Sequence, residues 1–184
     1  IIFVLIITGG LAVFFMNGQN TKELASRINP TIEENESAAV TEITSSDNRF
    51  MFQYPNSWTL SDLTTGSLQG KFGKILQSWT LTSSKDTNAA TVTIEIESGG
   101  SNLPIDDLVD CGMKTVSCDK IGIDDEQFIK SVANLNSGAQ MITVATFYDS
   151  NILRGTAMIP PGPAQENLRQ EAEAILMSFH FVEK

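Results

Sequence analysis

The stretch Arg49-Phe-Met-Phe-Gln-Tyr-Pro-Asn-Ser-Trp-Thr-Leu60 marks where the folded part of this chain begins. Aromatic residues at positions 50, 52 and 54 alternate with other residues, which is the period of a strand with one buried face. Pro55 ends that strand because it cannot donate a ladder hydrogen bond. Asn56 and Ser57 are turn formers, after which the alternation resumes. The stretch predicts two short strands whose core residues are Phe50, Phe52, Tyr54 and Trp58.

Strand patterns recur further along the chain. Apolar residues between Phe72 and Leu81, and again from Val92 to Ile96, predict a hairpin that turns near residues 84–88. Ranges 128–135, 139–148 and 152–159 predict three successive strands, which must be antiparallel because the turns between them are short. The residues alternating with Val92, Ile94 and Ile96 are expected to meet water or a light cover, and they are Thr91, Thr93, Glu95 and Glu97.

Two helices are expected. Pro104 opens a short one, with Ile105, Leu108, Val109 and Gly112 on one side. The second follows the sheet-breaking run Pro160-Pro-Gly-Pro163 and carries an apolar stripe at helical spacing. We interpret this stripe as core packing against the sheet, and its members are Leu168, Ala172, Ile175, Leu176 and Phe179.

The first 16 residues, Ile1 to Met16, are apolar apart from Thr8, Gly9 and Gly10, and they carry no charge. As a helix they reach roughly 24 Å, short of the ~30 Å hydrocarbon core of a bilayer. The chain starts without Met, so we expect a transmembrane signal-anchor that begins upstream of Ile1, with helix potential to about residue 28. A cleaved signal peptide is the rival interpretation. A type IV pilin helix is disfavoured because its fifth residue would be Glu, and here it is Leu5.

Residues 29–47 are rich in Glu, Ser, Thr and Asn and hold no aromatic residue, which predicts a flexible polar tether. Residues 48–184 are then the globular domain. The formal net charge is −10, and no cluster of Lys or Arg stands out. This pattern argues against nucleic acid and against an anionic lipid surface as partners.

The chain has two cysteines, Cys111 and Cys118, separated by six residues. In a domain outside the cytoplasm, such a pair most often forms a disulfide that closes a small loop. A reactive thiol, an unpaired structural cysteine and a two-ligand metal site are the alternatives. Zinc would need about four ligands, and the single histidine, His180, is distant in sequence.

Acidic residues gather between Asp106 and Glu126. Three of them, Asp106, Asp107 and Asp110, suit the start of a helix, where its dipole favours negative charge. The range 119–126 fails as an EF-hand loop because Ile121 and Ile123 stand where oxygen ligands are needed, so a turn is predicted there. A Ser-His-Asp triad could be built only on His180. No catalytic, cofactor-binding or metal-ligating residue is assigned, and no cofactor is expected.

Two end motifs resemble the PsbP-like domain family, named for an extrinsic subunit of the photosynthetic oxygen-evolving complex. They are Phe50-x-Phe-x-Tyr-Pro-x-x-Trp58 and Ile175-Leu-x-Ser-Phe-x-Phe181. The middle segments Pro104-Ile-Asp-Asp-Leu-Val109 and Leu135-Asn-Ser-Gly-Ala-Gln-Met-Ile-Thr-Val144 are similar to that family's short helix and turn-strand segment. The resemblance covers about residues 46–182, and the cysteine pair is a departure from it.

The resemblance implies an α+β fold, an antiparallel sheet with helices packed on its faces in an α/β/α sandwich, and a non-enzymatic role. We therefore expect a membrane-anchored interaction domain outside the cytoplasm, acting as an accessory or assembly subunit. Its partners would be an unidentified membrane or envelope protein and, through residues 1–16, the lipid bilayer. The alternative is an envelope domain that binds a small ligand or a divalent cation in the acidic region 106–126.

Overall fold

The computed structural model describes residues 39–65 (62–65 as backbone only), 68–83, 89–100, 102–112 and 115–182, and the backbone of 6–7 and 10–11. The chain divides into two compact units, Ile1–Glu36 and Ser37–Lys184. In the first unit, β1 (Ile6–Ile7) and β2 (Gly10–Leu11) pair antiparallel. The rest of the predicted membrane segment, and the tether up to residue 38, lie outside the described residues. Of the described helices, none has the length and apolarity needed to span a bilayer.

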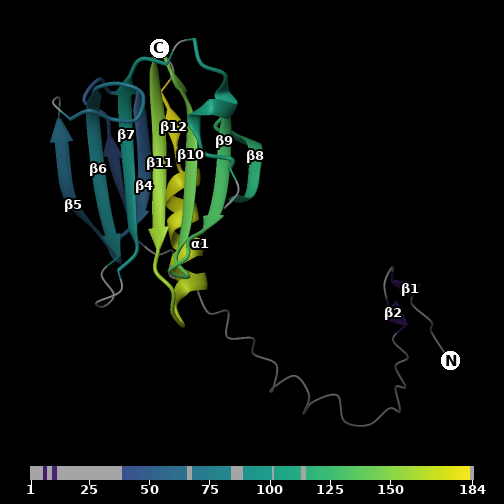
Figure 1. The fold of residues 1–184 in the computed structure, drawn as a ribbon. Helices are drawn as coiled ribbons and strands as arrows, with labels where there is room; N and C mark the ends of the chain where they lie inside the picture. Colours follow the sequence, from purple (N-terminus) through teal and green to yellow (C-terminus); the bar gives the residue numbers. More distant parts are fainter. Residues whose placement is uncertain are drawn as a thin grey trace, which may run out of the picture. The chain divides into compact units, whose positions relative to one another are not determined.

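The second unit contains two antiparallel sheets (Figure 1). The larger has seven strands in the order β5-β6-β7-β11-β10-β9-β8, and the smaller has three in the order β12-β4-β3. The strands of the large sheet are β5 (Trp58–Thr65), β6 (Ile75–Ser83), β7 (Thr91–Ser98), β8 (Thr115–Ile123), β9 (Glu126–Asn134), β10 (Gln140–Tyr148) and β11 (Asn151–Ile159). Those of the small sheet are β3 (Val40–Thr44), β4 (Phe50–Pro55) and β12 (His180–Phe181).

The hairpin strands predicted for the C-terminal half agree with β9, β10 and β11 to within two residues. Two other predictions, for residues 119–126 and for residues 40–44, are wrong. The expected turn over 119–126 is confined to Asp124 and Asp125, because the residues before them continue β8 along the edge of the sheet. Residues 40–44, assigned to the tether, form β3, because the free edge of β4 offers a partner that composition alone does not reveal.

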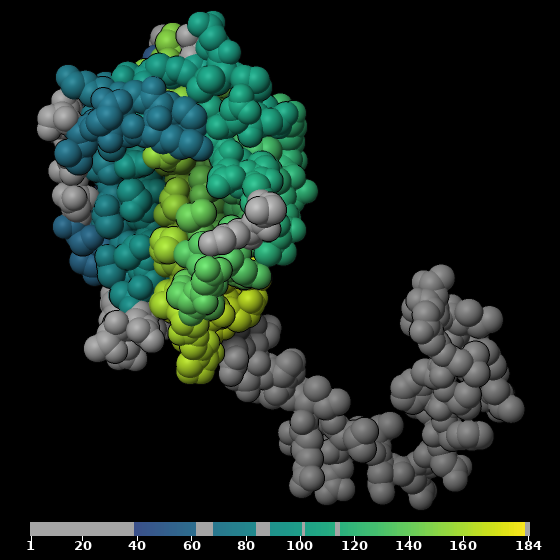
Figure 2. Space-filling view, in the orientation of Figure 1, coloured from purple at the N-terminus to yellow at the C-terminus, as the bar shows by residue number. Residues whose placement is uncertain are grey.

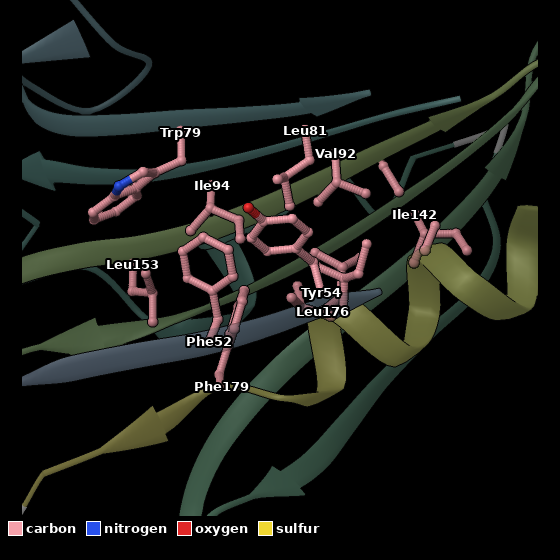
Figure 3. Packing of buried hydrophobic residues seen from close by; sticks show 14 of the residues in the cluster. Phe52, Tyr54, Trp79, Leu81, Val92, Ile94, Ile142, Leu153, Leu176 and Phe179 are labelled. Atoms are coloured by element: carbon pink, nitrogen blue, oxygen red, sulfur yellow. The ribbon is translucent and has the colours of Figure 1, made fainter. Parts of the chain in front are cut away.

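The main core lies between the large sheet and a second layer made of the small sheet and helix α1 (Gln165–Met177). Figure 3 shows side chains of β4 and α1 meeting those of β6 and β7 between these layers. All eight predicted core residues are at most 9% exposed: Phe50, Phe52, Tyr54, Trp58, Leu168, Ile175, Leu176 and Phe179. The helix packs closely because β11 has Gly155 there, where a β-carbon would stand 2.5 Å from Leu176 and 2.8 Å from Phe179.

The opposite face of the large sheet differs from the expected sandwich. In the described residues it carries no α-helix, only the 3-10 turn η1 (Ile105–Leu108) and loops. The backbone is extended on both sides of η1, at Pro104 and Val109, so the predicted helix ends after four residues. The chain there packs as a small second core, made of Leu108, Val109, Ile129, Ala145 and Ile152. Over the residues that the structure describes, the fold is therefore mainly antiparallel sheet with one α-helix.

Candidate functional site

The two cysteines are joined. Cys111 and Cys118 form a disulfide with their α-carbons 5.8 Å apart. It ties the loop after η1 to the edge strand β8, and Cys118 packs against the small second core. The disulfide prediction is confirmed, and neither sulfur is left as a nucleophile or a metal ligand. The disulfide therefore holds the loop after η1 against the large sheet.

The acidic residues of 106–126 do not converge. Asp106 pairs with Lys120 at 3.1 Å, and Asp110 accepts the backbone N–H of Gly112 at 2.9 Å. Asp124 lies at the far end of β8, where it contacts His180. Within the described ranges, no group of three or more His, Cys, Asp or Glu side chains is arranged to hold a metal ion. The region is thus a set of separate surface contacts.

A buried charge cluster, which the sequence pattern does not predict, lies under the segment 68–74. Glu97 is 0% exposed, although it was expected to meet water or a light cover. Its Oε1 lies 2.5 Å from Nη2 of Arg154, and its Oε2 accepts the backbone N–H of Phe72 at 2.9 Å. The same Arg154 nitrogen donates to Glu95 at 2.8 Å. Burying a carboxylate is costly unless it is paired in this way.

The sheet register explains how this cluster forms. Glu95 and Arg154 are directly opposed on β7 and β11. Gly70 permits the covering segment to approach, since a β-carbon there would stand 2.3 Å from Oε2 of Glu97. Acidic residues at alternate strand positions are a sequence signal, but the pairing of strands distant in sequence supplies the arginine. The cluster fastens the segment 68–74 to the sheet.

Below that segment the face of the large sheet is open. Loops lie over the upper part of this face in Figure 2 and leave β11, in yellow-green, at the surface. Two cross-strand rows occupy the open part: Thr80–Thr93–Thr156 and Thr82–Thr91–Met158–Met141. These side chains are half-buried, apart from Met158, which is 38% exposed. Among the described residues, neither row contains a charged side chain.

A groove of about 420 Å³ lies on the other side of the molecule, at the end of α1. His180 lines it, and its Nδ1 lies 2.7 Å from Oδ2 of Asp124. The same Asp124 oxygen accepts the backbone N–H of Phe181 at 2.8 Å, and this hydrogen bond, ahead of the contact with His180, lowers the pKa of Asp124. Met51, Gln53, Met177 and Ser178 also line the groove.

The groove does not contain a serine triad, although a serine, a histidine and an aspartate line it. The single proton of the Ser178 hydroxyl has two acceptors within reach, the carbonyl oxygens of Gln53 at 3.0 Å and Ile175 at 2.7 Å. The hydroxyl oxygen also accepts the backbone N–H of Gln53 at 2.9 Å. This serine therefore fastens the end of α1 to β4. His180 and Asp124 remain as a hydrogen-bonded pair, in which Nδ1 of His180 contacts the carboxylate and Nε2 is the ring's second nitrogen.

No family model and no curated protein matches this chain. Among solved structures, the PsbP protein of the cyanobacterium Synechocystis matches 79% of this chain and 94% of its own, at 10% identity and a TM-score of 0.54. The Ran-binding protein Mog1p of Saccharomyces cerevisiae matches 80% of this chain and 97% of its own, at 9% identity and a TM-score of 0.51. At such identities the likeness concerns the fold alone, and the chain has a PsbP-like fold.

Proposed function

We propose that residues 39–182 form a non-enzymatic, protein-binding domain, which acts as an accessory or assembly subunit of an envelope complex. The apolar residues 1–16 would anchor it in a membrane, with the domain outside the cytoplasm. One observation carries the binding role: the open, uncharged threonine and methionine rows on β6, β7, β10 and β11.

The composition of these rows favours a protein partner over water alone. An antiparallel sheet can expose one face to solvent, and its strands then alternate core-facing apolar residues with solvent-facing polar ones. This chain has 34 charged side chains, counting Lys, Arg, Asp and Glu, yet the rows have none among the described residues. The centres of protein interfaces are depleted of charged residues and enriched in methionine. A protein of the same fold, Mog1p, is described as Ran-binding, so this architecture accommodates a protein-binding role.

The location outside the cytoplasm has separate support. Disulfides persist in oxidising compartments and are rare in the cytosol, and Cys111–Cys118 is such a bond. The apolar residues 1–16 supply an anchor of the expected composition. Alkaline phosphatase fused after Lys184 should be active in bacterial cells, because that enzyme folds only outside the cytoplasm. If this fusion is inactive and a reporter that works only in the cytoplasm is active at the same position, the domain lies in the cytoplasm and the proposed orientation is wrong.

The binding role is tested by affinity capture of the full chain from gently solubilised membranes. We expect one or two proteins near stoichiometry, lost when Thr93 and Thr156 are both replaced by Glu, since two buried charges in an interface are costly. The matched control is Thr44→Glu, an exposed threonine on β3, which should leave capture unchanged. Equal capture by the double variant would show that these rows are not the interface.

A further inference from the structure

Two methionines and the only histidine line the same groove at the end of α1. His180 and Met51 are direct cross-strand partners on β12 and β4, so their β-carbons are about 5 Å apart. Met177 is the last residue of α1, and the hydroxyl of Ser178 ties the turn that follows to β4. Register and capping thus hold three side chains, each with a soft or borderline donor atom, around one space.

We propose that this groove is a binding site for a soft monovalent metal ion, Cu(I) or its analogue Ag(I). The ligands are the thioether sulfurs of Met51 and Met177 and Nε2 of His180.

The donor set decides the class of ion. Thioether sulfur is a soft ligand that selects Cu(I), and imidazole suits copper as well. Calcium and magnesium need several oxygen ligands, and structural zinc sites almost always have four N, S or O ligands. Of the carboxylate and imidazole ligands that these ions commonly take, the groove offers only Asp124 and His180, and Oδ2 of Asp124 already contacts the N–H of Phe181 and Nδ1 of His180. The cysteines are joined in a disulfide, so the thioethers are the sulfur donors that remain.

Asp124 acts as a positioning residue for the imidazole. When the ring is neutral and donates from Nδ1 to the carboxylate, Nε2 keeps its lone pair, which is the arrangement that metal-bound histidines commonly have. The carboxylate of Asp124 also accepts the N–H of Phe181, and the backbone of Asp124 is in the left-handed region, with φ of 51°. None of the described residues lining the groove is Lys or Arg, so no fixed positive charge opposes a cation.

Exposure of the methionines agrees with this role. Met177 is 42% exposed, and Met51 is only partly buried. Single apolar residues on a protein surface are common and by themselves indicate nothing. The distinguishing fact here is that both thioethers border the groove that holds the histidine. Met141 and Met158 are also direct cross-strand partners, on β10 and β11. The residue opposite Met158 on β7 is Thr91, however, and no histidine among the described residues lies beside this pair.

The test is titration of the full chain in detergent with Ag(I), which needs no reductant and leaves the disulfide intact. With methyl-13C methionine, one equivalent should shift the signals of Met51 and Met177, and 15N spectra should show Nε2 of His180 shifting. Met51→Leu, Met177→Leu and His180→Gln should each weaken Ag(I) affinity at least about tenfold, since even outer-shell changes cost that much. Leucine keeps the approximate volume of methionine, so folding should be retained.

The matched control is Met158→Leu, at a methionine 38% exposed, against 42% for Met177, on the open face of the large sheet; this variant should bind Ag(I) as the parent does. The proposal is overturned if Met51→Leu/Met177→Leu binds Ag(I) with parental affinity. It is equally overturned if the shifted methyl signals belong to Met16, Met113, Met141 or Met158 instead.

Discussion

At the residue scale, Trp58 joins the two layers. It is 2% exposed, and its Nε1–H donates to Oε2 of Glu171 on α1 at 2.7 Å. Trp58→Ala should lower the free energy of unfolding by about 3–5 kcal/mol, because it removes a large buried ring and leaves a cavity. Denaturant unfolding measures this directly. The neighbouring exposed residue is the control: Thr59→Ala should stay within about 0.5 kcal/mol of the parent.

Tyr148 gives the domain a pH dependence on the alkaline side. Burial, together with its hydrogen bond to Asp47 at 2.8 Å, raises the pKa of Tyr148 from 10.0 to about 12. The unfolded chain therefore releases this proton first, so the contribution to stability is complete below pH 10 and is lost as the pH rises toward 12.

Tyr148→Phe should remove that part of the alkaline loss. The measurement is urea unfolding of both proteins across this pH window, with phenolate absorbance to follow the tyrosine itself. Since other groups also titrate there, the informative quantity is the difference between the two stability curves. Parallel curves from pH 10 to 12 would contradict the assigned pKa.

The sequence predicts burial well where the pattern of apolar residues is periodic and local. The alternation of Phe50, Phe52 and Tyr54 predicts a buried face because a strand has a period of two wherever it lies. Glu97 stands at the same alternate positions as Thr91 and Thr93, yet it is fully buried. Its burial depends on the segment 68–74 folding over it and on Arg154 arriving from β11, and neither is encoded near position 97.

At the scale of elements, the disulfide holds the loop after η1 against β8. Cys111→Ser/Cys118→Ser should cost about 2–3 kcal/mol, the chain-entropy estimate for a loop this short. Hydrogen exchange should locate the effect, with faster exchange at η1 and at the start of β8 and little change in α1. Uniformly faster exchange would mean that the bond supports the whole domain. Mass spectrometry of the parent protein should first show the two cysteines linked.

The candidate sites follow the same division. Cys111 and Cys118 could be paired from the sequence because they are close together and alone. The groove could not be predicted, since His180 and Met51 lie on two different strands and Asp124 lies in the β8–β9 turn, and only the folded topology brings them together. The α/β/α expectation required a longer helix than η1, which has four residues. The reason is local, because an apolar face at helical spacing does not show where the backbone becomes extended.

At the scale of the whole molecule, the unit Ser37–Lys184 is compact by itself. A chain of residues 39–184 should therefore unfold at the same denaturant midpoint as the full chain in detergent. A second truncation, starting at Arg49, should be less stable, because it removes β3 and leaves the edge of β4 unpaired. A lower midpoint for the first truncation would show that residues before 39 contribute to the fold.

The pairing of β7 with β11 has a consequence for synthesis on the ribosome. The strands β5 to β7 form one local meander and β8 to β11 another, and only the β7–β11 ladder, which matches Ser98 with Asn151, joins them within the sheet. At translation rates of about 5–20 residues per second, β7 waits roughly three to ten seconds for its partner. An unpaired strand edge is prone to aggregation, and charged residues on it suppress this. We therefore expect Glu95 and Glu97 to keep the nascent edge of β7 soluble until Arg154 emerges and pairs with both carboxylates.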